Sequence, residues 1–264
     1  MGTIYKNPSV VEVICELHWE LTAVALPAVG GIDPFFDVVR ADLTPRLAAA
    51  GFPQSQELAP PQVPRQFLAW QPIVRFAPTA DTWPKVQLGP GLLTVNMAGQ
   101  PYTGWPDFQP PVASAVSALL ESFPTPNRFL RLKSLQLKYI NAFTDKHDFK
   151  TYAQFTSKYL GLRSVLPDRF IESIRTPASV IATNSQTRLP VAEPRNSHVV
   201  VQVAEAQINQ SPGCVLQLSI ERNGATEHDQ IMQWFEDAHT LARKTFLSLV
   251  GADLVNLMQP EEKE

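Results

Sequence analysis

Cysteine and net charge are scarce in this chain of 264 residues, and each shortage argues against a class of protein. The two cysteines, Cys15 and Cys214, lie far apart in apolar segments, which predicts buried, reduced thiols in a cytoplasmic protein rather than a disulfide-linked secreted one. The net charge of −3 gives no general attraction to nucleic acid or anionic lipid. No apolar run reaches the roughly 18 residues of a membrane span, and no signal peptide is recognisable.

Proline is abundant by contrast, with 24 residues against 12 glycines. Most prolines lie between periodic segments in the first half, where their fixed φ is typical of stiff loops. Hydrophobic residues make up 44% of the chain, which is enough for a substantial core and argues against disorder.

Hydrophobic periodicity predicts clusters of strands separated by isolated helices. Such an arrangement favours an α+β fold, a mainly antiparallel sheet covered by helices, with a long C-terminal helix packed on it. We expect one domain over 1–264, with two diverged β/α halves, 1–146 and 147–264, as the alternative. Strands are predicted at 9–20, 65–77, 83–97, 128–143, 170–184, 197–208 and 214–222, and helices at 34–50 (with Asp33 as N-cap), 107–123, 148–160 and 228–250.

The first strand carries a stripe of ionisable side chains on one face: Glu12, Glu16, His18 and Glu20. Alternate residues of a strand lie about 7 Å apart, so these groups could share a proton or bind a metal. The simpler interpretations are a solvated polar face, or pairing with basic residues of the 128–143 strand, which stabilises a sheet modestly. Pairing is the preferred explanation.

Other candidate chemistry is sparse. Glu236 and His239 have Glu-x-x-His spacing, but di-iron bundles need two such pairs, so a packed core histidine is the favoured interpretation. No nucleophile elbow, phosphate-binding loop, dinucleotide fingerprint or zinc motif is present, so no metal ligand or cofactor is predicted. The weak catalytic candidates are Glu12, Glu16, His18 and His239.

Two further segments are candidates for binding a partner. Tyr102 and Trp105 precede a predicted helix, where aromatic residues either line a pocket or fasten the loop to the core. The strand at 128–138 interleaves Arg131, Lys133 and Lys138 with apolar residues, a pattern that could follow a phosphate backbone. The overall charge favours pairing of these bases with the glutamate stripe instead.

Several motifs together resemble a sporadically distributed family of uncharacterised bacterial proteins of about this length. The start Y-x-N-P-P-[IV]-x-E-x-x-C-E is matched from Tyr5 to Glu16, except that Ser9 replaces the second proline. The motifs Y-x-G-W (102–105), [RK]-Y-I-N (138–141) and W-F-x-x-A-H (234–239) follow in order. The resemblance implies carriage on mobile or defence-related gene clusters and transfers no chemistry to any residue.

The sequence therefore predicts a non-catalytic binding or assembly protein, an accessory component of a bacterial defence or mobile-element system. Its expected partner is another protein, with self-association left open, and neither a membrane nor a cofactor is expected. Two alternatives stay open at this point. One is a metal- or acid/base-dependent enzyme that uses Glu12, Glu16 and His18, with His239 brought near by folding. The other is a nucleic-acid-associated subunit that uses the basic strand.

Overall fold

The strand predicted at residues 9–20 forms β2 (Val10–Trp19), which lies at the centre of the sheet beside β7 (Leu132–Phe143). The two strands are antiparallel, with Cys15 opposite Leu137 and Leu17 opposite Leu135. Successive side chains of a strand alternate between faces, so these apolar residues share one face of the sheet. The computed structural model describes residues 4–22, 31–60, 62–99, 102–163, 165–175 and 183–261.

Nine strands form one antiparallel sheet in the order β3-β4-β5-β6-β2-β7-β10-β9-β8. This arrangement confirms the predicted α+β fold with its mainly antiparallel sheet. A separate two-stranded ribbon pairs β1 (Ile4–Tyr5) with β11 (Pro260–Glu261). The remaining strands are β3 (Gln54–Glu57), β4 (Val74–Ala77), β5 (Lys85–Gly89), β6 (Leu92–Ala98), β8 (Ser185–Pro190), β9 (Ser197–Ile208) and β10 (Ser211–Asn223).

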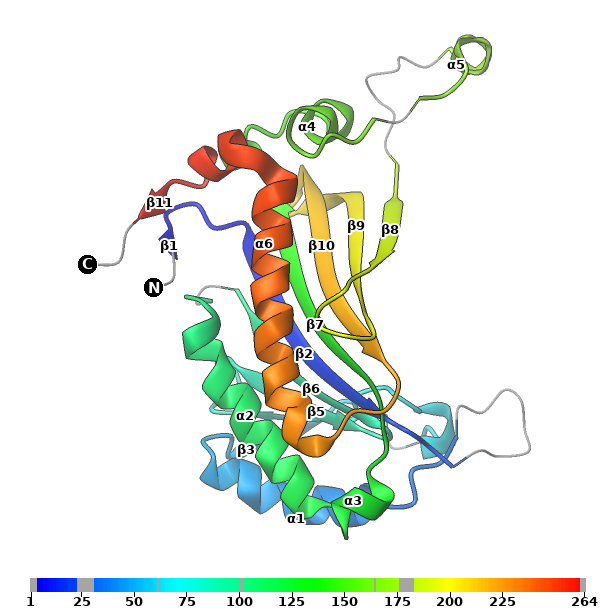
Figure 1. Cartoon of the computed structure of the whole chain (residues 1–264), viewed down its shortest axis with the longest axis vertical. Coiled ribbons are helices and arrows are strands. Elements are labelled where there is room, and N and C mark those ends of the chain that lie inside the picture. The colour runs from blue at the N-terminus through cyan, green and yellow to red at the C-terminus, as the bar shows by residue number, and fades with distance from the viewer. Residues whose placement is uncertain are drawn as a thin grey trace.

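Three helices, α1 (Phe36–Ala49), α2 (Trp105–Ser122) and α6 (Ile231–Leu257), cover one face of the sheet (Figure 1). The long helix α6 packs on β7 and β10, as predicted for the C-terminal helix, and α1 packs on α2. The shorter helices are α3 (Pro126–Phe129), α4 (Tyr152–Tyr159) and α5 (Asp168–Ile174). No helix in the described part of the chain combines the length and apolarity that a membrane crossing requires.

The two halves of the chain follow a similar, though not identical, order of elements. The first runs β2-α1-β3-β4-β5-β6-α2, and the second runs β7-α4-α5-β8-β9-β10-α6. In each half the first strand lies at the centre of the sheet, and the later strands return to it one by one from the edge. The second set therefore begins with β7, before residue 147. The single domain over 1–264, with two diverged halves as the alternative, remains a prediction.

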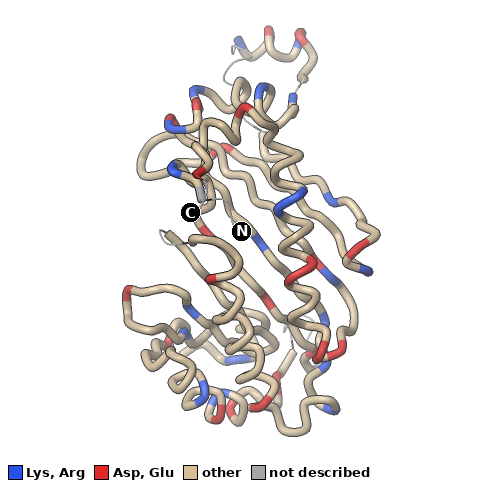
Figure 2. Tube along the Cα trace, turned by 60° about the vertical axis from the view of Figure 1, so that its left-hand side comes forward, with Lys and Arg blue, Asp and Glu red and all other residues tan. Residues whose placement is uncertain are grey.

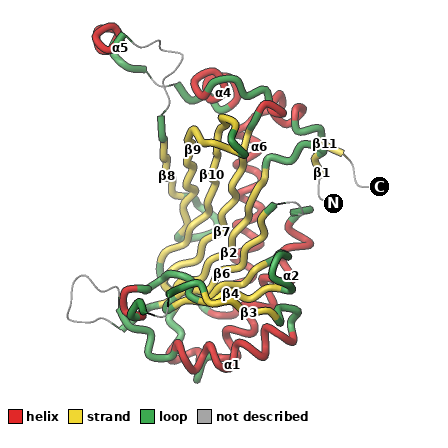
Figure 3. Tube along the Cα trace, turned by 180° about the vertical axis from the view of Figure 1, so that it is seen from behind, coloured by secondary structure: helices red, strands yellow, loops and turns green. Residues whose placement is uncertain are grey.

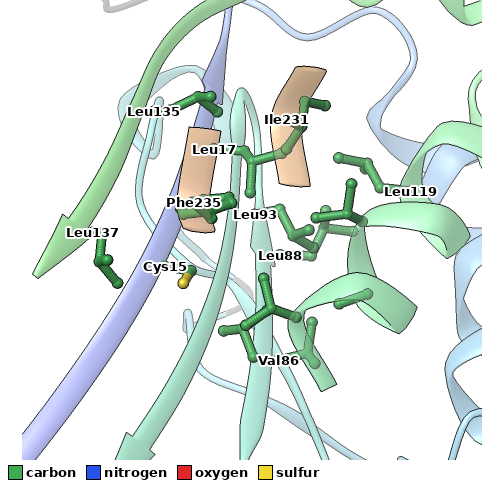
Figure 4. Close-up of a cluster of buried hydrophobic side chains, with 14 of the residues drawn as sticks. Cys15, Leu17, Val86, Leu88, Leu93, Leu119, Leu135, Leu137, Ile231 and Phe235 are labelled. Carbon is green, nitrogen blue, oxygen red and sulfur yellow. The ribbon is translucent and has the colours of Figure 1, made fainter. Parts of the chain in front are cut away.

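The core lies between the sheet and the helices. Cys15 and Leu17 of β2, Leu135 of β7 and Phe235 of α6 gather in one cluster of buried side chains (Figure 4). Cys15 is free and fully buried, as is Cys214. Burial raises the pKa of the Cys15 thiol well above its ordinary value, and that of Cys214 to about 12. The predicted burial of both thiols is thus confirmed.

Within the described part of the chain no α-helix covers the opposite face of the sheet (Figure 3), and alternate positions of its central strands are polar. Hydrogen bonds cross it from strand to strand: Asn96 donates to Glu12 over 3.2 Å, and Gln136 donates to Glu221 over 2.8 Å. An antiparallel sheet can leave one face to water, and polar residues at alternate positions satisfy that face. Glu12, Glu16 and His18 of the predicted stripe belong to this surface, whereas Glu20 follows the end of β2.

Three local predictions are wrong. Within 65–77 only Val74–Ala77 is a strand, because Pro72 lacks an N–H and residues 65–67 form a 3₁₀ turn. Within 170–184 the chain forms α5, whose Phe170 and Ile174 have helical spacing; residues 176–182 lie outside the described ones. Asp33 does not cap α1, which begins at Phe36. Its carboxylate instead accepts hydrogen bonds from the Phe35 N–H and the Trp19 indole.

Candidate functional site

A cavity of about 280 Å³ opens between the start of α2 and the middle of α6, on the helix-covered side of the sheet. Its floor includes Tyr139 of β7, and Tyr102 and Trp105 form part of its wall. Apolar side chains such as Phe246 make up much of the remaining lining. A concave, mostly apolar site with a few polar groups is typical of small-molecule binding sites.

Helical spacing places the polar groups of α6 together. Glu236, His239 and Arg243 follow one another at intervals of three and four residues, so they share a face of the helix, and all three line the cavity. On the other side, α2 begins at Trp105 directly after Gly104, whose φ of 139° allows the chain to turn into the helix. The two helices therefore present an indole and an imidazole to each other.

A chain of hydrogen bonds joins three elements in the wall of the cavity. The hydroxyl oxygens of Tyr102 and Tyr139 are 3.2 Å apart, and the Tyr139 oxygen is 2.8 Å from Nδ1 of His239. Burial raises the pKa of Tyr102 to about 12 and that of Tyr139 well above its ordinary value. Both phenols are therefore neutral and keep their protons for hydrogen bonding at physiological pH.

Trp105 contacts both His239 and Glu236 of α6. Its ring lies parallel to that of His239, with centroids 5.1 Å apart and an interplanar angle of 9°. Its Nε1–H donates to Oε2 of Glu236 over 2.6 Å. Burial lowers the pKa of His239, although the nearby Glu236 charge acts in the opposite direction. The imidazole is therefore neutral at pH 7.

Three sequence-predicted site residues, Tyr102, Trp105 and His239, thus meet in one place, where His239 is both packed and hydrogen-bonded as expected. Sequence reasoning missed Tyr139 and Arg243 as members of the site. Glu236 was recognised only through its spacing from His239, and no cavity was predicted on that face of α6.

The glutamate stripe lies on the opposite face of the sheet, so His239 is not brought near Glu12, Glu16 and His18. This geometry contradicts the expectation that folding would join them. Glu16 is bound by His18 at 3.1 Å and by Lys138 at 3.4 Å. Burial alone would raise the pKa of Glu16, but these two partners outweigh it and lower the pKa. Pairing with the basic strand is thus confirmed for Lys138.

The other two cations of the basic strand do not join this face. The Lys133 ammonium lies 4.3 Å from the centre of the Trp70 ring. Lys133 and Arg131 both line a second, more polar hollow of about 900 Å³, together with the acidic residues Glu20, Glu227 and Asp229. Charges of both signs are interspersed along the described trace (Figure 2). Among the described residues, no group of three His, Cys, Asp or Glu side chains is placed to hold a metal ion.

The fold and the cavity together define an α+β protein with an aromatic-lined site between two helices. No family model, no curated protein and no solved structure matches the chain. The resemblance to the sporadically distributed bacterial family therefore remains a prediction.

We expect the protein to lose stability as the pH falls from 7.5 to 5.5. Burial lowers the pKa of both His239 and His147. The unfolded chain, with a histidine pKa of about 6.5, then binds more protons than the folded one, so the free energy of unfolding falls below that pH. In addition, Nδ1 of His147 accepts the Thr144 N–H over 3.2 Å, and protonation would remove this acceptor.

Urea denaturation at the two pH values tests this expectation. The carboxylates with lowered pKa, Glu16 and Asp148, titrate below this window, so they do not obscure the result. A variant with His147→Gln and His239→Gln should show a smaller fall in midpoint than the original protein. A midpoint that does not change with pH would contradict the assignment of both rings as neutral.

Proposed function

We propose that this chain is a non-catalytic binding protein, and that a small molecule occupies the cavity between α2 and α6. The observation that carries the proposal is the cavity itself, where aromatic walls surround a short chain of neutral hydrogen-bonding groups. Its volume of about 280 Å³ lies at the lower end of the range for ligand sites. The ligand is accordingly smaller than a typical drug.

The state of the lining groups favours binding over turnover. The phenol of Tyr102, with a pKa of about 12, does not exchange its proton readily near neutral pH. The Nδ1 atom of His239 is already engaged by Tyr139. The thiols of Cys15 and Cys214 are buried in the sheet and neither lines the cavity. The Tyr139 hydroxyl is paired with the His239 imidazole, but burial raises the pKa of this phenol well above its ordinary value, which disfavours its activation as a nucleophile.

The wider expectation is an accessory role in a bacterial defence or mobile-element system, with another protein as partner. This part of the proposal rests on the resemblance alone and adds no residue to the site. The two alternatives gain no support from the geometry. Glu16 is paired with Lys138 and His18. The basic residues near the start of β7 line a hollow together with acidic residues.

Filling the cavity should abolish binding. Ala242 lines the cavity from α6, so Ala242→Met places a flexible apolar side chain in the space that the ligand needs. Thr240→Met adds the same side chain two residues away at an exposed position that does not line the cavity. Ligand-observed NMR with a library of neutral and charged fragments would measure binding to the original protein and both variants.

We expect a set of fragments to bind the original protein and Thr240→Met, and to lose at least about tenfold in affinity for Ala242→Met, equivalent to about 1.4 kcal/mol. Urea denaturation of both variants would show that each is folded. If no fragment binds, or if the bound fragments are insensitive to Ala242→Met, the cavity is not a ligand site and the proposal fails.

A further inference from the structure

One cation at the cavity lacks a partner. Arg243 lines the cavity one helical turn after His239, and it forms no salt bridge or hydrogen bond with any residue that the structure describes. Some arginines elsewhere on the surface are paired, for example Arg46 with Asp42 and Arg188 with Glu221, whereas others, such as Arg131, have no such partner among the described residues. A guanidinium offers five N–H donors in a planar fork that matches a carboxylate. Arg243 therefore gives the cavity an unused donor with a positive charge.

The hydrogen-bond chain supplies a second donor. A phenol is the better donor and an imidazole nitrogen the better acceptor of the two, so the Tyr139 hydroxyl donates to Nδ1 of His239 and Tyr102 donates to Tyr139. The neutral imidazole then carries its proton on Nε2. Nε2 has no hydrogen-bond partner among the described residues. It is also not one of the side-chain polar atoms that are both fully buried and without a hydrogen-bond partner. His239 thus has a free N–H one turn from Arg243.

The acidic group at the cavity is already occupied. Glu236 accepts the Trp105 indole N–H, and it precedes Arg243 by seven residues of α6. Seven residues span about 10 Å along a helix axis. The polar rim is therefore positive at the Arg243 end, whereas His239 lies only three residues from Glu236 and is affected by its charge.

We infer that the ligand is a small organic acid, with its carboxylate bound by Arg243 and the Nε2–H of His239. Its apolar body lies against Trp105, Tyr102 and Phe246, which line the same cavity. This inference rests on the proposed function, because it names the class of ligand for that site. Charge-assisted hydrogen bonds are about twice as strong as neutral ones, so the acid is preferred over a neutral molecule of the same shape.

Isothermal titration calorimetry with three probes of matched shape tests the inference: phenylacetate, phenylacetamide and phenethylamine. We expect phenylacetate to bind at least about tenfold more tightly than the amide, and the amine to bind most weakly. Arg243→Gln should reduce the affinity for phenylacetate to that for the amide and leave the amide unaffected. Lys244→Gln removes the next cation along α6, which does not line the cavity, and should change neither affinity.

The outcomes separate this inference from the function on which it rests. If the amide or the amine binds as tightly as the acid, or Arg243→Gln leaves the preference intact, the acid is not the ligand class, although the cavity remains a binding site. If none of the three probes binds but fragments of the library still bind at the cavity, the inference is again overturned and the proposed binding function stands. If no fragment binds either, both fall together.

Discussion

Replacement of Phe235 by alanine is expected to lower the free energy of unfolding by about 3–5 kcal/mol. Phe235 has no exposed surface, and it projects from α6 into the cluster that contains Leu17, Leu135 and Cys15 (Figure 4). Removal of the ring takes away its burial and leaves a cavity that tightly packed neighbours fill only in part. Because α6 packs on β7 and β10, the loss of this ring weakens the packing of the whole helix on the sheet.

Urea denaturation would measure this loss, with Phe67→Ala as the matched control. Phe67 is 53% exposed, so its replacement is expected to change the free energy of unfolding by no more than about 0.5 kcal/mol. Equal effects of the two substitutions would show that α6 does not depend on its apolar face. A loss of 3–5 kcal/mol is a large share of the 5–15 kcal/mol that is usual for a folded domain.

The fold was predictable where the signal is local. Val13, Cys15, Leu17 and Trp19 alternate with polar residues, and this period of two is itself the pattern of a strand with one buried face. The hairpin of β9 and β10 was predictable for the same reason, since a turn with Pro212 and Gly213 nearby separates two alternating segments. Strand order could not be predicted from the sequence. β2 and β7 are neighbours at the centre of the sheet because the later strands of each half start at an edge and pair inward toward them.

The charge pairing was predictable in kind but only partly in detail. Lys138 lies opposite Ile14 on the neighbouring strand, two residues from Glu16 and on the same face, so it reaches that carboxylate diagonally. Arg131 precedes β7, and an irregularity in pairing at His18 and Trp19 shifts the register there. Register depends on three-dimensional pairing, so the partners of the basic residues at this end could not be assigned from spacing alone.

The cavity was not predictable as a site. Tyr102, Tyr139 and His239 come from a loop, a strand and a helix that are separated by 37 and 100 residues, and no short-range spacing connects them. Each was recognisable as an aromatic or polar residue near the core. Their convergence follows from the placement of α2 and α6 on the same face of the sheet (Figure 1), which is a consequence of the whole topology.

Replacement of Trp105 by alanine is expected to affect stability and the site together. Trp105 is 4% exposed and belongs to the core cluster, so the loss of its ring should cost about 3–5 kcal/mol in the free energy of unfolding. The same change removes the donor to Glu236 and the ring that lies against His239. Trp105→Phe keeps an aromatic ring but loses the N–H, and it should cost less than the alanine variant.

The titration of His239 distinguishes a lost wall from a merely destabilised protein. With Trp105→Ala, water reaches the imidazole, the burial that lowers its pKa is relieved, and the pKa should rise toward its ordinary value of about 6.5. Trp105→Phe should leave the pKa of His239 closer to that of the original protein. NMR titration of the His239 ring resonances in the folded variants would measure both. An unchanged pKa in Trp105→Ala would mean that the indole does not shield His239 from water. The position of the imidazole would then depend on its hydrogen bond to Tyr139 alone.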